Sequence, residues 1–239
     1  MNYVKTKNFN FEDIQKNEFA SGTVGQSARH HLAIYRRSLQ KSKPTILELG
    51  THRGKSTTAF LQVCRERGGR LFSVDIADCS AVSNDRNWRF IRNDSADVDD
   101  VLGKAPELRQ GIDVLLIDTL HTRAHVEKEF YGWFPYLRKN AIVLFDDVDP
   151  FKYRQGGEKD NYKNEFDWED IQEFVIEVFR ANEDDMLLEI HFGSTGLAIL
   201  EKVSDMGELP VRPHKMRYRT KSTIWQIKRK FANLRQSLM

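Results

Sequence analysis

Aspartates stand directly after two apolar runs of the sequence, and acids in such positions can bind a cation. Asp118 follows the run VLLI, and Asp146 and Asp147 follow the run IVLF. If these runs are neighbouring parallel strands, their carboxyl ends meet at one edge of the sheet. Clustered carboxylates repel one another unless a cation joins them, and Mg²⁺ prefers oxygen ligands of this kind. The pattern predicts a divalent-cation site, with Mg²⁺ as the expected ion, at Asp118, Asp146 and Asp147.

A glycine turn lies earlier in the chain. The segment ILELGTHRGKSTTAF places Gly50 and Gly54 between an expected strand and an expected helix. At such a junction the backbone N–H groups face a ligand, and glycine lets that ligand approach closely. Glu48 precedes the turn, and Asp75 ends the next strand about 20 residues downstream, where an ionised carboxylate accepts hydrogen bonds from ribose hydroxyls. This pattern is typical of class I methyltransferases that use S-adenosylmethionine (SAM).

The glycine turn is also compatible with different functions. The letters GKST resemble the end of a P-loop and would make the chain an NTPase, although the glycines stand one residue closer together than that motif requires. A dinucleotide-binding turn would need glycine at the position of His52. A tight turn with an ordinary surface aspartate would bind no ligand, and a non-catalytic module that binds SAM or a partner would carry out no reaction.

Short apolar runs alternate with amphipathic stretches from Thr45 onward, which is typical of crossover βα units. The last two runs are close enough in sequence to form an antiparallel hairpin. We therefore predict an α/β, Rossmann-like class I methyltransferase fold: a seven-stranded, mostly parallel sheet with an antiparallel C-terminal hairpin and helices on both faces. The expected strands are 45–49, 70–75, 88–91, 113–117, 141–145, 186–191 and 197–201; the expected helices are 27–39, 56–67, 122–137 and 168–180; and 149–167 is expected to be a long loop.

The charge of the chain is divided unevenly. Lys and Arg total 37 against 35 Asp and Glu, yet no acid follows Glu208, and nine bases lie beyond it. We expect an N-terminal helical cap (1–43), a SAM-binding methyltransferase domain (44–203) and a basic, amphipathic helical tail (204–239). The N-terminal helix and the tail are candidates for a homo-oligomer contact, and contact of the tail with an anionic surface is an alternative. Nucleic acid is disfavoured because no RNA-binding module is visible.

Composition excludes several other classes of protein. The 239 residues suffice for one sizeable domain. No apolar run approaches the roughly 20 residues that a membrane span needs, and the N-terminal stretch MNYVKTKNFNFED lacks an apolar signal core. Cys64 and Cys79 are too few for a disulfide framework. We expect a cytoplasmic protein. Peripheral contact of its tail with a membrane surface is compatible with this expectation.

The motifs together resemble a known family. Seven segments carry the resemblance: ILELGTHRGKST, LFSVD, RNDSADV, DVLLIDTLHTRAHVEKEF, WFPYLRKNAIVLFDDV, WEDIQEFVIEVF and GLAILEK. They resemble the Methyltransf_24-type family of class I SAM-dependent methyltransferases. The chain is thus similar to macrocin O-methyltransferase and, more distantly, to catechol O-methyltransferase. The resemblance implies metal ligands at Asp118, Asp146 and Asp147. It also implies cofactor-binding residues at Glu48, Gly50, Thr51, Gly54, Ser56, Asp75, Asp94, Ser95 and Asp118.

The segment after the fourth strand departs from that family's pattern. Where members commonly read D-G-D-H or D-G-D-x-Y, this chain reads DTLH from Asp118 to His121, so the second acid and the glycine are missing. His121 is our candidate general base because a histidine pKa lies near working pH, and Asp118 is the second catalytic candidate. A structural role for His121 at the start of a helix is the alternative. His125 is expected on the exposed face of that helix.

The expected reaction is methyl transfer from SAM to a hydroxyl of a small molecule or glycan, and the resemblance favours a sugar-like acceptor. Such a transfer is an in-line displacement, and a hydroxyl is a poor nucleophile until its proton is removed. A divalent cation at the carboxylates would lower the pKa of the hydroxyl and hold it in line with the methyl group.

Overall fold

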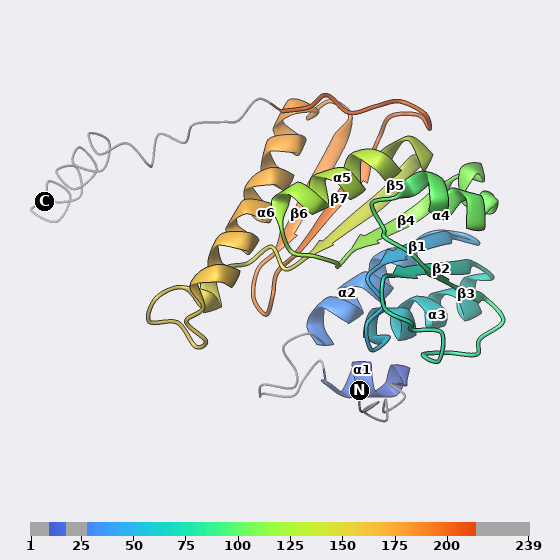
Figure 1. Cartoon of the computed structure of the whole chain (residues 1–239), viewed down its shortest axis with the longest axis horizontal. Helices are drawn as coiled ribbons and strands as arrows, with labels where there is room; N and C mark the ends of the chain where they lie inside the picture. Colours follow the sequence, from blue (N-terminus) through green and yellow to red (C-terminus); the bar gives the residue numbers. More distant parts are fainter. Residues whose placement is uncertain (1–9, 18–27, 214–239) are drawn as a thin grey trace, which may run out of the picture.

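The computed structural model describes residues 10–17 and 28–213, and within them the chain forms one seven-stranded sheet (Figure 1). The strands are β1 (Thr45–Leu49), β2 (Arg70–Asp75), β3 (Trp88–Arg92), β4 (Ile112–Ile117), β5 (Leu137–Asp146), β6 (Met186–His191) and β7 (Leu197–Lys202). Their order in the sheet is β3-β2-β1-β4-β5-β7-β6. The first five pair in parallel, whereas β7 runs antiparallel to both β5 and β6. The predicted fold class is confirmed.

The order of strands creates a switch point in the middle of the sheet. β1 pairs with β2 on one side and with β4 on the other, so the chain first builds the sheet in one direction and then in the opposite direction. The connections that leave the carboxyl ends of β1 and β4 therefore diverge and open a crevice between them. Ligands bind at this position in open α/β sheets, so the fold places the glycine turn and Asp118 at the same crevice.

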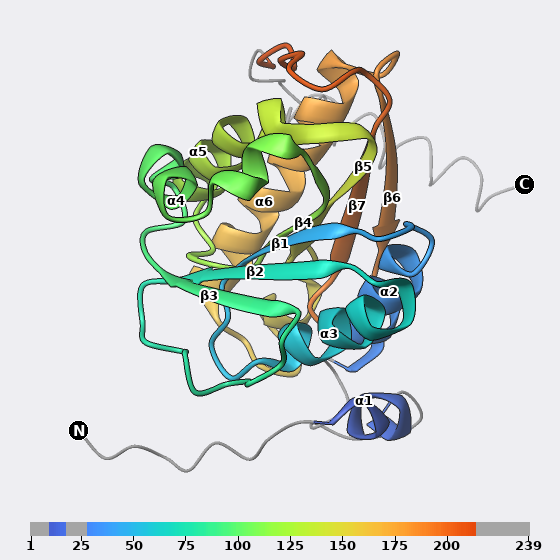
Figure 2. The ribbon, with the colours of Figure 1, turned by 90° about the vertical axis from the view of Figure 1, so that its right-hand side faces the viewer.

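Helices cover both faces of the sheet (Figures 1 and 2). The elements are α1 (Phe11–Asn17), α2 (Ala28–Ser38), α3 (Lys55–Arg67), α4 (Val98–Lys104), α5 (Arg123–Trp133) and α6 (Tyr162–Ala181), with short 3-10 turns η1 (Pro106–Gln110), η2 (Phe134–Tyr136) and η3 (Phe151–Tyr153). Figure 2 shows α4, α5 and α6 on one face and α2 and α3 on the other. α1 packs on that second layer, because its Ile14 clusters with Leu32 of α2 and Ala59 of α3.

Alternation along β1 explains the two layers. Leu47 and Leu49 are buried in the cluster that contains Phe130 of α5, whereas Ile46 is buried in the cluster that contains Phe60 of α3. Successive side chains of a strand point to opposite faces, so Glu48 is directed to the α3 side together with Ile46. A buried strand covered on both faces reads as a continuous apolar run, and the single acid in this run marks the position that serves the glycine turn.

The structure differs from the predicted elements where local polarity is high. α6 begins at Tyr162 and η3 lies at 151–153, so the prediction of a loop over 149–167 is wrong for those segments. The first turns of α6 are polar because they project beyond the core, and the apolar stripe begins only near Trp168. β5 begins at Leu137, before its apolar run. The helices α1 and α4 are short and were not predicted.

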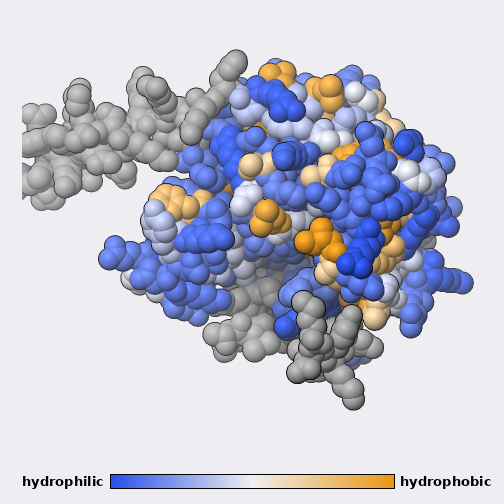
Figure 3. All heavy atoms as spheres, viewed as in Figure 1, coloured by the Kyte–Doolittle hydropathy of each residue, from blue (hydrophilic) through white to orange (hydrophobic). Residues whose placement is uncertain are grey.

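Hydrophilic residues cover most of the face shown in Figure 3. Among the described residues, no helix combines the length and the apolar composition needed to cross a membrane. The predicted helix in the basic tail falls beyond residue 213 and so lies outside the described residues.

Candidate active site at the switch point

Two cavities meet above the carboxyl ends of β1, β2, β4 and β5. The larger cavity, about 630 Å³, is lined by Gly50, His52, Val74, Asp75, Ile76, Asp94, Ser95, Asp118, Thr119, Leu120, His121 and His125. The smaller cavity, about 250 Å³, is lined by His31, Gly50, Thr51, His52, Arg53, Lys55, Ser56, Asp118, Asp146, Asp147 and Thr195. Gly50, His52 and Asp118 line both, so a ligand in one cavity would lie next to a ligand in the other.

The glycine turn separates β1 from α3 and requires its glycines. Gly50 has φ +93°, and a Cβ added there would lie 1.8 Å from the carbonyl oxygen of Asp118. Gly54 also has a positive φ and precedes α3. Asp75 Oδ2 accepts hydrogen bonds from the backbone N–H groups of Thr51 and His52, each at 2.9 Å. The predicted acid at the end of β2 is thus held against the turn at one side of the larger cavity.

Glu48 lies beneath the turn and lines neither of the two cavities. Its side chain is fully buried and accepts hydrogen bonds from the hydroxyls of Thr57 and Ser73. Burial outweighs these bonds and raises the pKa of Glu48 to about 7. The structure therefore gives this predicted cofactor residue a place under the binding surface, whereas Thr51, Ser56, Asp94 and Ser95 line the cavities themselves.

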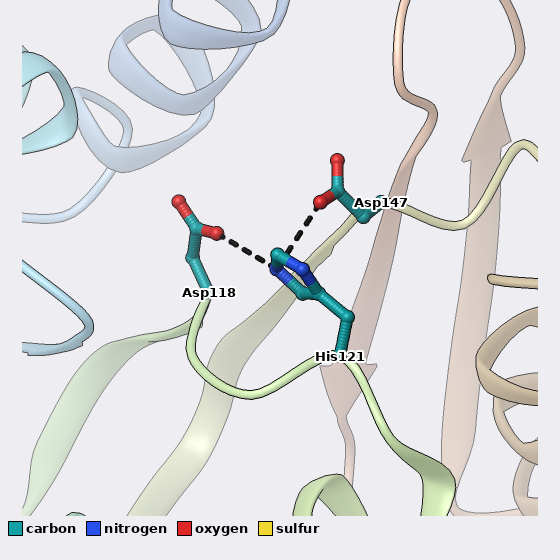
Figure 4. Close-up of side chains that lie close together, drawn as sticks. All are labelled: Asp118, His121 and Asp147. Carbon is teal, nitrogen blue, oxygen red and sulfur yellow. Dashed lines mark hydrogen bonds and ion pairs between the residues drawn. The ribbon is translucent and has the colours of Figure 1, made fainter. Parts of the chain in front are cut away.

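His121 stands between two of the predicted metal ligands (Figure 4). Its Nε2 lies 3.2 Å from Oδ1 of Asp118, at the end of β4, and 3.1 Å from Oδ2 of Asp147, after β5. The three side chains each offer a ligand atom, and these atoms lie within 4.8 Å of one another. Asp147 has φ +58°, a strained backbone conformation for a residue with a side chain, as is common at functional sites. We call Asp118, His121 and Asp147 the acidic cluster.

The acidic cluster holds more negative charge than its surroundings balance. Burial and the neighbouring Asp146 raise the pKa of Asp147 well above its usual value. Burial also raises the pKa of Asp118, against the hydrogen bond from His121. Burial alone would lower the pKa of His121, but the bond to Asp118 and the charge of Asp147 outweigh it and raise that pKa to about 9. The histidine acts here as the cation that the carboxylates require.

The third predicted metal ligand, Asp146, has other neighbours. Its Oδ1 accepts a hydrogen bond from the hydroxyl of Thr195 at 3.0 Å and lies 3.5 Å from Nδ1 of His30 on α2. Burial would raise the pKa of Asp146, but the hydrogen bond and charge of His30 hold it below its usual value. The structure therefore gathers Asp118 and Asp147 around His121 and directs an oxygen of Asp146 toward His30, although all three carboxylates line the smaller cavity.

A second polar cluster forms the floor of the larger cavity on the α5 side. Glu129 is fully buried and accepts hydrogen bonds from the hydroxyls of Ser95 and Thr119. His125 Nε2 lies 3.2 Å from Oε1 of Glu129, and its side chain is only 20% exposed, so the expectation of an exposed His125 was wrong. The hydrogen bond to Glu129 raises the pKa of His125. We call Ser95, Thr119, His125 and Glu129 the α5 cluster.

Sequence reasoning missed Glu129 and His30. A glutamate within a charged helix ordinarily faces solvent, so nothing in its immediate neighbours marked Glu129 for burial. The available signal was the spacing of His125, Glu129 and Trp133, which places three side chains on one face of a helix. For His30, the signal was a pair of histidines in a helix that precedes the first strand.

Comparison with known proteins identifies the class of this domain. Residues 47–148 match the family model Methyltransf_24, described as a methyltransferase domain. Over these residues the match confirms the resemblance found in the motifs. No curated protein matches the chain.

Solved structures share the fold. The chain is similar to MycE methyltransferase from the mycinamycin biosynthetic pathway in complex with Mg and SAH (S-adenosylhomocysteine), with a TM-score of 0.57 and 19% identity over 86% of this chain and 58% of MycE. It is also similar to SAH-bound Podospora anserina methyltransferase PaMTH1 (TM-score 0.54, 14% identity, 80% of this chain and 86% of that one).

A third likeness is to CalS11, a TDP-rhamnose 3'-O-methyltransferase of calicheamicin biosynthesis (TM-score 0.50, 17% identity, 80% of this chain and 91% of that one). At these identities the likenesses show the fold. The chain spans 58% of the length of MycE.

Proposed function

We propose that this protein is a SAM-dependent, divalent-metal-assisted O-methyltransferase that acts on a hydroxyl of a small molecule or glycan, with a sugar-like acceptor favoured. The observation that carries the proposal is the junction of the two cavities at Asp118. The larger cavity runs from Asp75 to Asp118, and the smaller cavity begins where the acidic cluster lies. A cofactor in the first would thus present its reactive end to an acceptor in the second.

SAM, bound in the larger cavity, would supply the activated methyl group. Asp75 would accept hydrogen bonds from the ribose hydroxyls, since a carboxylate oxygen has lone pairs beyond those used by the turn. Asp94 and Ser95 would meet the base. Gly50 and Gly54 shape the turn so that the cofactor can approach the backbone. Thr51 and Ser56 line the smaller cavity at the start of α3, so they would meet the amino-acid end of the cofactor where that end reaches past Gly50 into the smaller cavity.

The donor set around Asp118 fits a hard divalent cation such as Mg²⁺. Asp118, Asp146 and Asp147 line one small cavity, and carboxylate oxygens are the ligands that Mg²⁺ prefers. Burial first, and the charge of Asp146 second, raise the pKa of Asp147, and a cation bound here would offset both effects. Such a cation would supply positive charge that lowers the pKa of an acceptor hydroxyl and helps to orient it.

His121 is the proposed general base. His121 lines the larger cavity, and its Nε2 lies within 3.2 Å of Asp118 and Asp147, which line the smaller one, so it stands near the junction where the acceptor hydroxyl would lie. The same two carboxylates raise the pKa of His121 to about 9, so only the deprotonated imidazole, whose share grows as pH rises toward 9, would take up the proton at Nε2. Asp118 would also fix the orientation of the imidazole ring through its bond to Nε2.

The nature of the acceptor rests on the solved structures with this fold. MycE has been solved with mycinamycin VI, and CalS11 is described as a TDP-rhamnose methyltransferase. The description of CalS11 names a sugar nucleotide, which supports a sugar-like acceptor here. The mixed acidic and basic lining of the smaller cavity is compatible with an acceptor rich in hydroxyl groups.

Calorimetry with SAM and with ATP tests the cofactor first. We expect SAM to bind and ATP not to bind; binding of ATP without SAM would make the chain an NTPase instead. A panel of sugars, glycosides and phenols then tests the reaction, with SAH release as the measurement. If SAM binds and no acceptor yields SAH, the chain is a non-catalytic binding module.

The metal is tested separately with EDTA and with the Asp147→Ala variant. We expect both to abolish most of the transfer, and Asp170→Asn, which changes an exposed acid of α6, serves as the matched control. If EDTA and Asp147→Ala leave transfer unchanged, the carboxylates are structural and the reaction needs no cation.

A further inference from the structure

Three side chains of α5 support the larger cavity from below. His125, Glu129 and Trp133 follow one another at intervals of four residues, so they lie along one face of the helix. The indole Nε1 of Trp133 donates a 2.9 Å hydrogen bond to the carbonyl oxygen of Ser95, which fixes the backbone there. Glu129 accepts a hydrogen bond from the hydroxyl of the same serine. Ser95 is therefore held by both its backbone and its side chain.

The direction of these hydrogen bonds determines what the cavity can offer a ligand. A hydroxyl group has one hydrogen to donate and two lone pairs to accept with, whereas an ionised carboxylate only accepts. Ser95 Oγ and Thr119 Oγ1 each use their single hydrogen on Glu129, Thr119 at 2.9 and 2.8 Å. His125 adds a third donor, an N–H group, to the same carboxylate. Toward the cavity, both hydroxyls can therefore present lone pairs alone.

We propose that Glu129 sets the hydrogen-bonding polarity of the larger cavity, so that Ser95 and Thr119 accept from an amino group and the cavity selects a 6-aminopurine over a 6-oxopurine. This inference rests on the proposed function, because the purine concerned is the adenine of SAM. Glu129 does not line the cavity and acts through the two hydroxyls. It is a positioning residue that determines specificity for the cofactor.

A 6-oxopurine reverses the pattern that such a cavity recognises. Adenine offers an amino group that donates to the lone pairs of the two hydroxyls, whereas hypoxanthine offers a carbonyl oxygen at the same position. Two acceptors would then face each other, and a buried polar group without a partner weakens binding by about tenfold or more. The ratio of the affinities for the two bases therefore measures whether the hydroxyls of Ser95 and Thr119 accept a hydrogen bond from the ligand or donate one to it.

Calorimetric titration of the full chain with SAH and with S-inosylhomocysteine tests the proposal. We expect the wild-type protein to bind SAH at least about tenfold more tightly. In the Glu129→Gln variant, the new amide N–H group donates to a hydroxyl, which can then turn its hydrogen toward the cavity. The preference for SAH should fall close to unity or reverse, because the variant offers the donor that a 6-oxo group accepts.

Glu127→Gln is the matched control. Glu127 lies on the same helix but pairs with Arg123 at 2.6 Å and does not line the larger cavity, so this variant should keep the wild-type preference. Thermal melting of each variant reports whether it is folded. If Glu129→Gln does not fold, Thr119→Val removes one of the accepting hydroxyls at nearly constant shape and should lower the preference for SAH.

The outcomes separate this inference from the proposed function. Equal binding of the two ligands by the wild-type protein would overturn the inference, and so would an unchanged preference in folded Glu129→Gln and Thr119→Val. Each of those results leaves the proposed function intact, because SAH still binds. Failure of the wild-type protein to bind either ligand would instead reject the proposed function, and the inference with it.

Discussion

Two clusters of polar side chains lie at the same crevice, and they differ in how the charge of their buried carboxylates is balanced. In the α5 cluster, one carboxylate, Glu129, receives hydrogen bonds from two hydroxyls and faces a histidine N–H group. In the acidic cluster, the carboxylates of Asp118 and Asp147 compete for His121. The first arrangement satisfies its charge internally, whereas the second leaves charge for a ligand to balance.

This difference indicates that the acidic cluster takes part in the chemistry, whereas the α5 cluster stabilises the shape of the site. A carboxylate with several donors gains little from a cation and keeps its neighbours in fixed orientations. Carboxylates that share one donor gain much from a cation, and the raised pKa of Asp147 reports that need. The two clusters adjoin through the neighbouring residues Thr119 and Asp118, so the rigid cluster supports the reactive one.

The largest expected effect comes from removing a carboxylate of the acidic cluster. Asp147→Ala should lower kcat/KM for methyl transfer by about a hundredfold or more, because it removes a ligand of the proposed cation and a partner of His121. SAH release measures the loss, and Asp170→Asn is the control. The free energy of unfolding should not fall with activity, because the lost side chain is a buried acid with a raised pKa. If the Asp147→Ala variant keeps an activity close to that of the wild type, the acidic cluster is structural, as the α5 cluster is.

Glu48 lies between the two cases, and its replacement tests the cost of burying a carboxylate whose hydrogen-bond donors are hydroxyls. Its pKa rises from 4.5 in the unfolded chain to about 7 in the folded protein, so the folded state keeps a proton that the unfolded state has lost. Wild-type stability should therefore fall as pH rises from 4.5 through 7 by about 3 kcal/mol from this group. Denaturant unfolding of wild type and Glu48→Gln at pH 5 and pH 8 measures the difference.

Glu48→Gln has no such proton to lose, so its stability relative to wild type should increase between pH 5 and pH 8. Ser80→Ala, which changes an exposed serine, provides a control in which the difference from wild type stays constant with pH. A constant difference for Glu48→Gln as well would show that Glu48 is ionised in the folded protein throughout this range.

A smaller effect is expected from taking one donor away from the α5 cluster. Thr119→Val removes the hydroxyl that contacts both oxygens of Glu129, at 2.9 and 2.8 Å. The buried carboxylate then loses one of its partners, which should destabilise the protein by about 1–2 kcal/mol. Chemical denaturation measures this, and Thr122→Val outside the cluster is the comparison. An unchanged stability would show that the α5 cluster has donors to spare.

The smallest effect is expected at His125, which is partly exposed. Glu129 raises the pKa of His125 in the folded protein, so the ion pair stabilises the protein below pH 6.5, and this stabilisation is lost as pH rises through the folded pKa. His125→Gln should therefore destabilise the protein by less than about 1 kcal/mol at pH 5.5 and by less still at pH 9. Thermal melting at the two pH values is the measurement, and a larger loss at pH 9 would contradict this pairing.

The sheet could be predicted because a buried strand appears in the sequence as a short apolar run. Each of the expected strands coincides with an observed strand, and the largest difference is the start of β5, where the polar residues 138–140 precede the apolar run of the strand. Pairing of Leu137 with Ile112 draws that polar stretch into the sheet. Hydrogen bonds between backbones carry no signature in side-chain polarity, so this extension could not be found from periodicity.

The site was predictable at the level of strand ends and not at the level of partners. Parallel strands bring their carboxyl ends to one edge, so the common location of Asp75, Asp118 and Asp147 follows from topology. Which acid approaches which histidine depends on turn geometry such as the positive φ of Asp147, and on the approach of α2, whose His30 faces Asp146. The metal-ligand set of Asp118, Asp146 and Asp147 therefore stays a prediction.

Gly50 has a thermodynamic consequence. Its α-carbon lies where any side chain would strike the carbonyl oxygen of Asp118, and the N–H of Asp118 donates to the neighbouring carbonyl of Leu49. The backbone that would hold the cofactor and the backbone that carries a proposed metal ligand are thus in direct contact. A ligand that shifts one must shift the other, so the affinities of cofactor and cation are expected to be linked, each changing the other by the same factor.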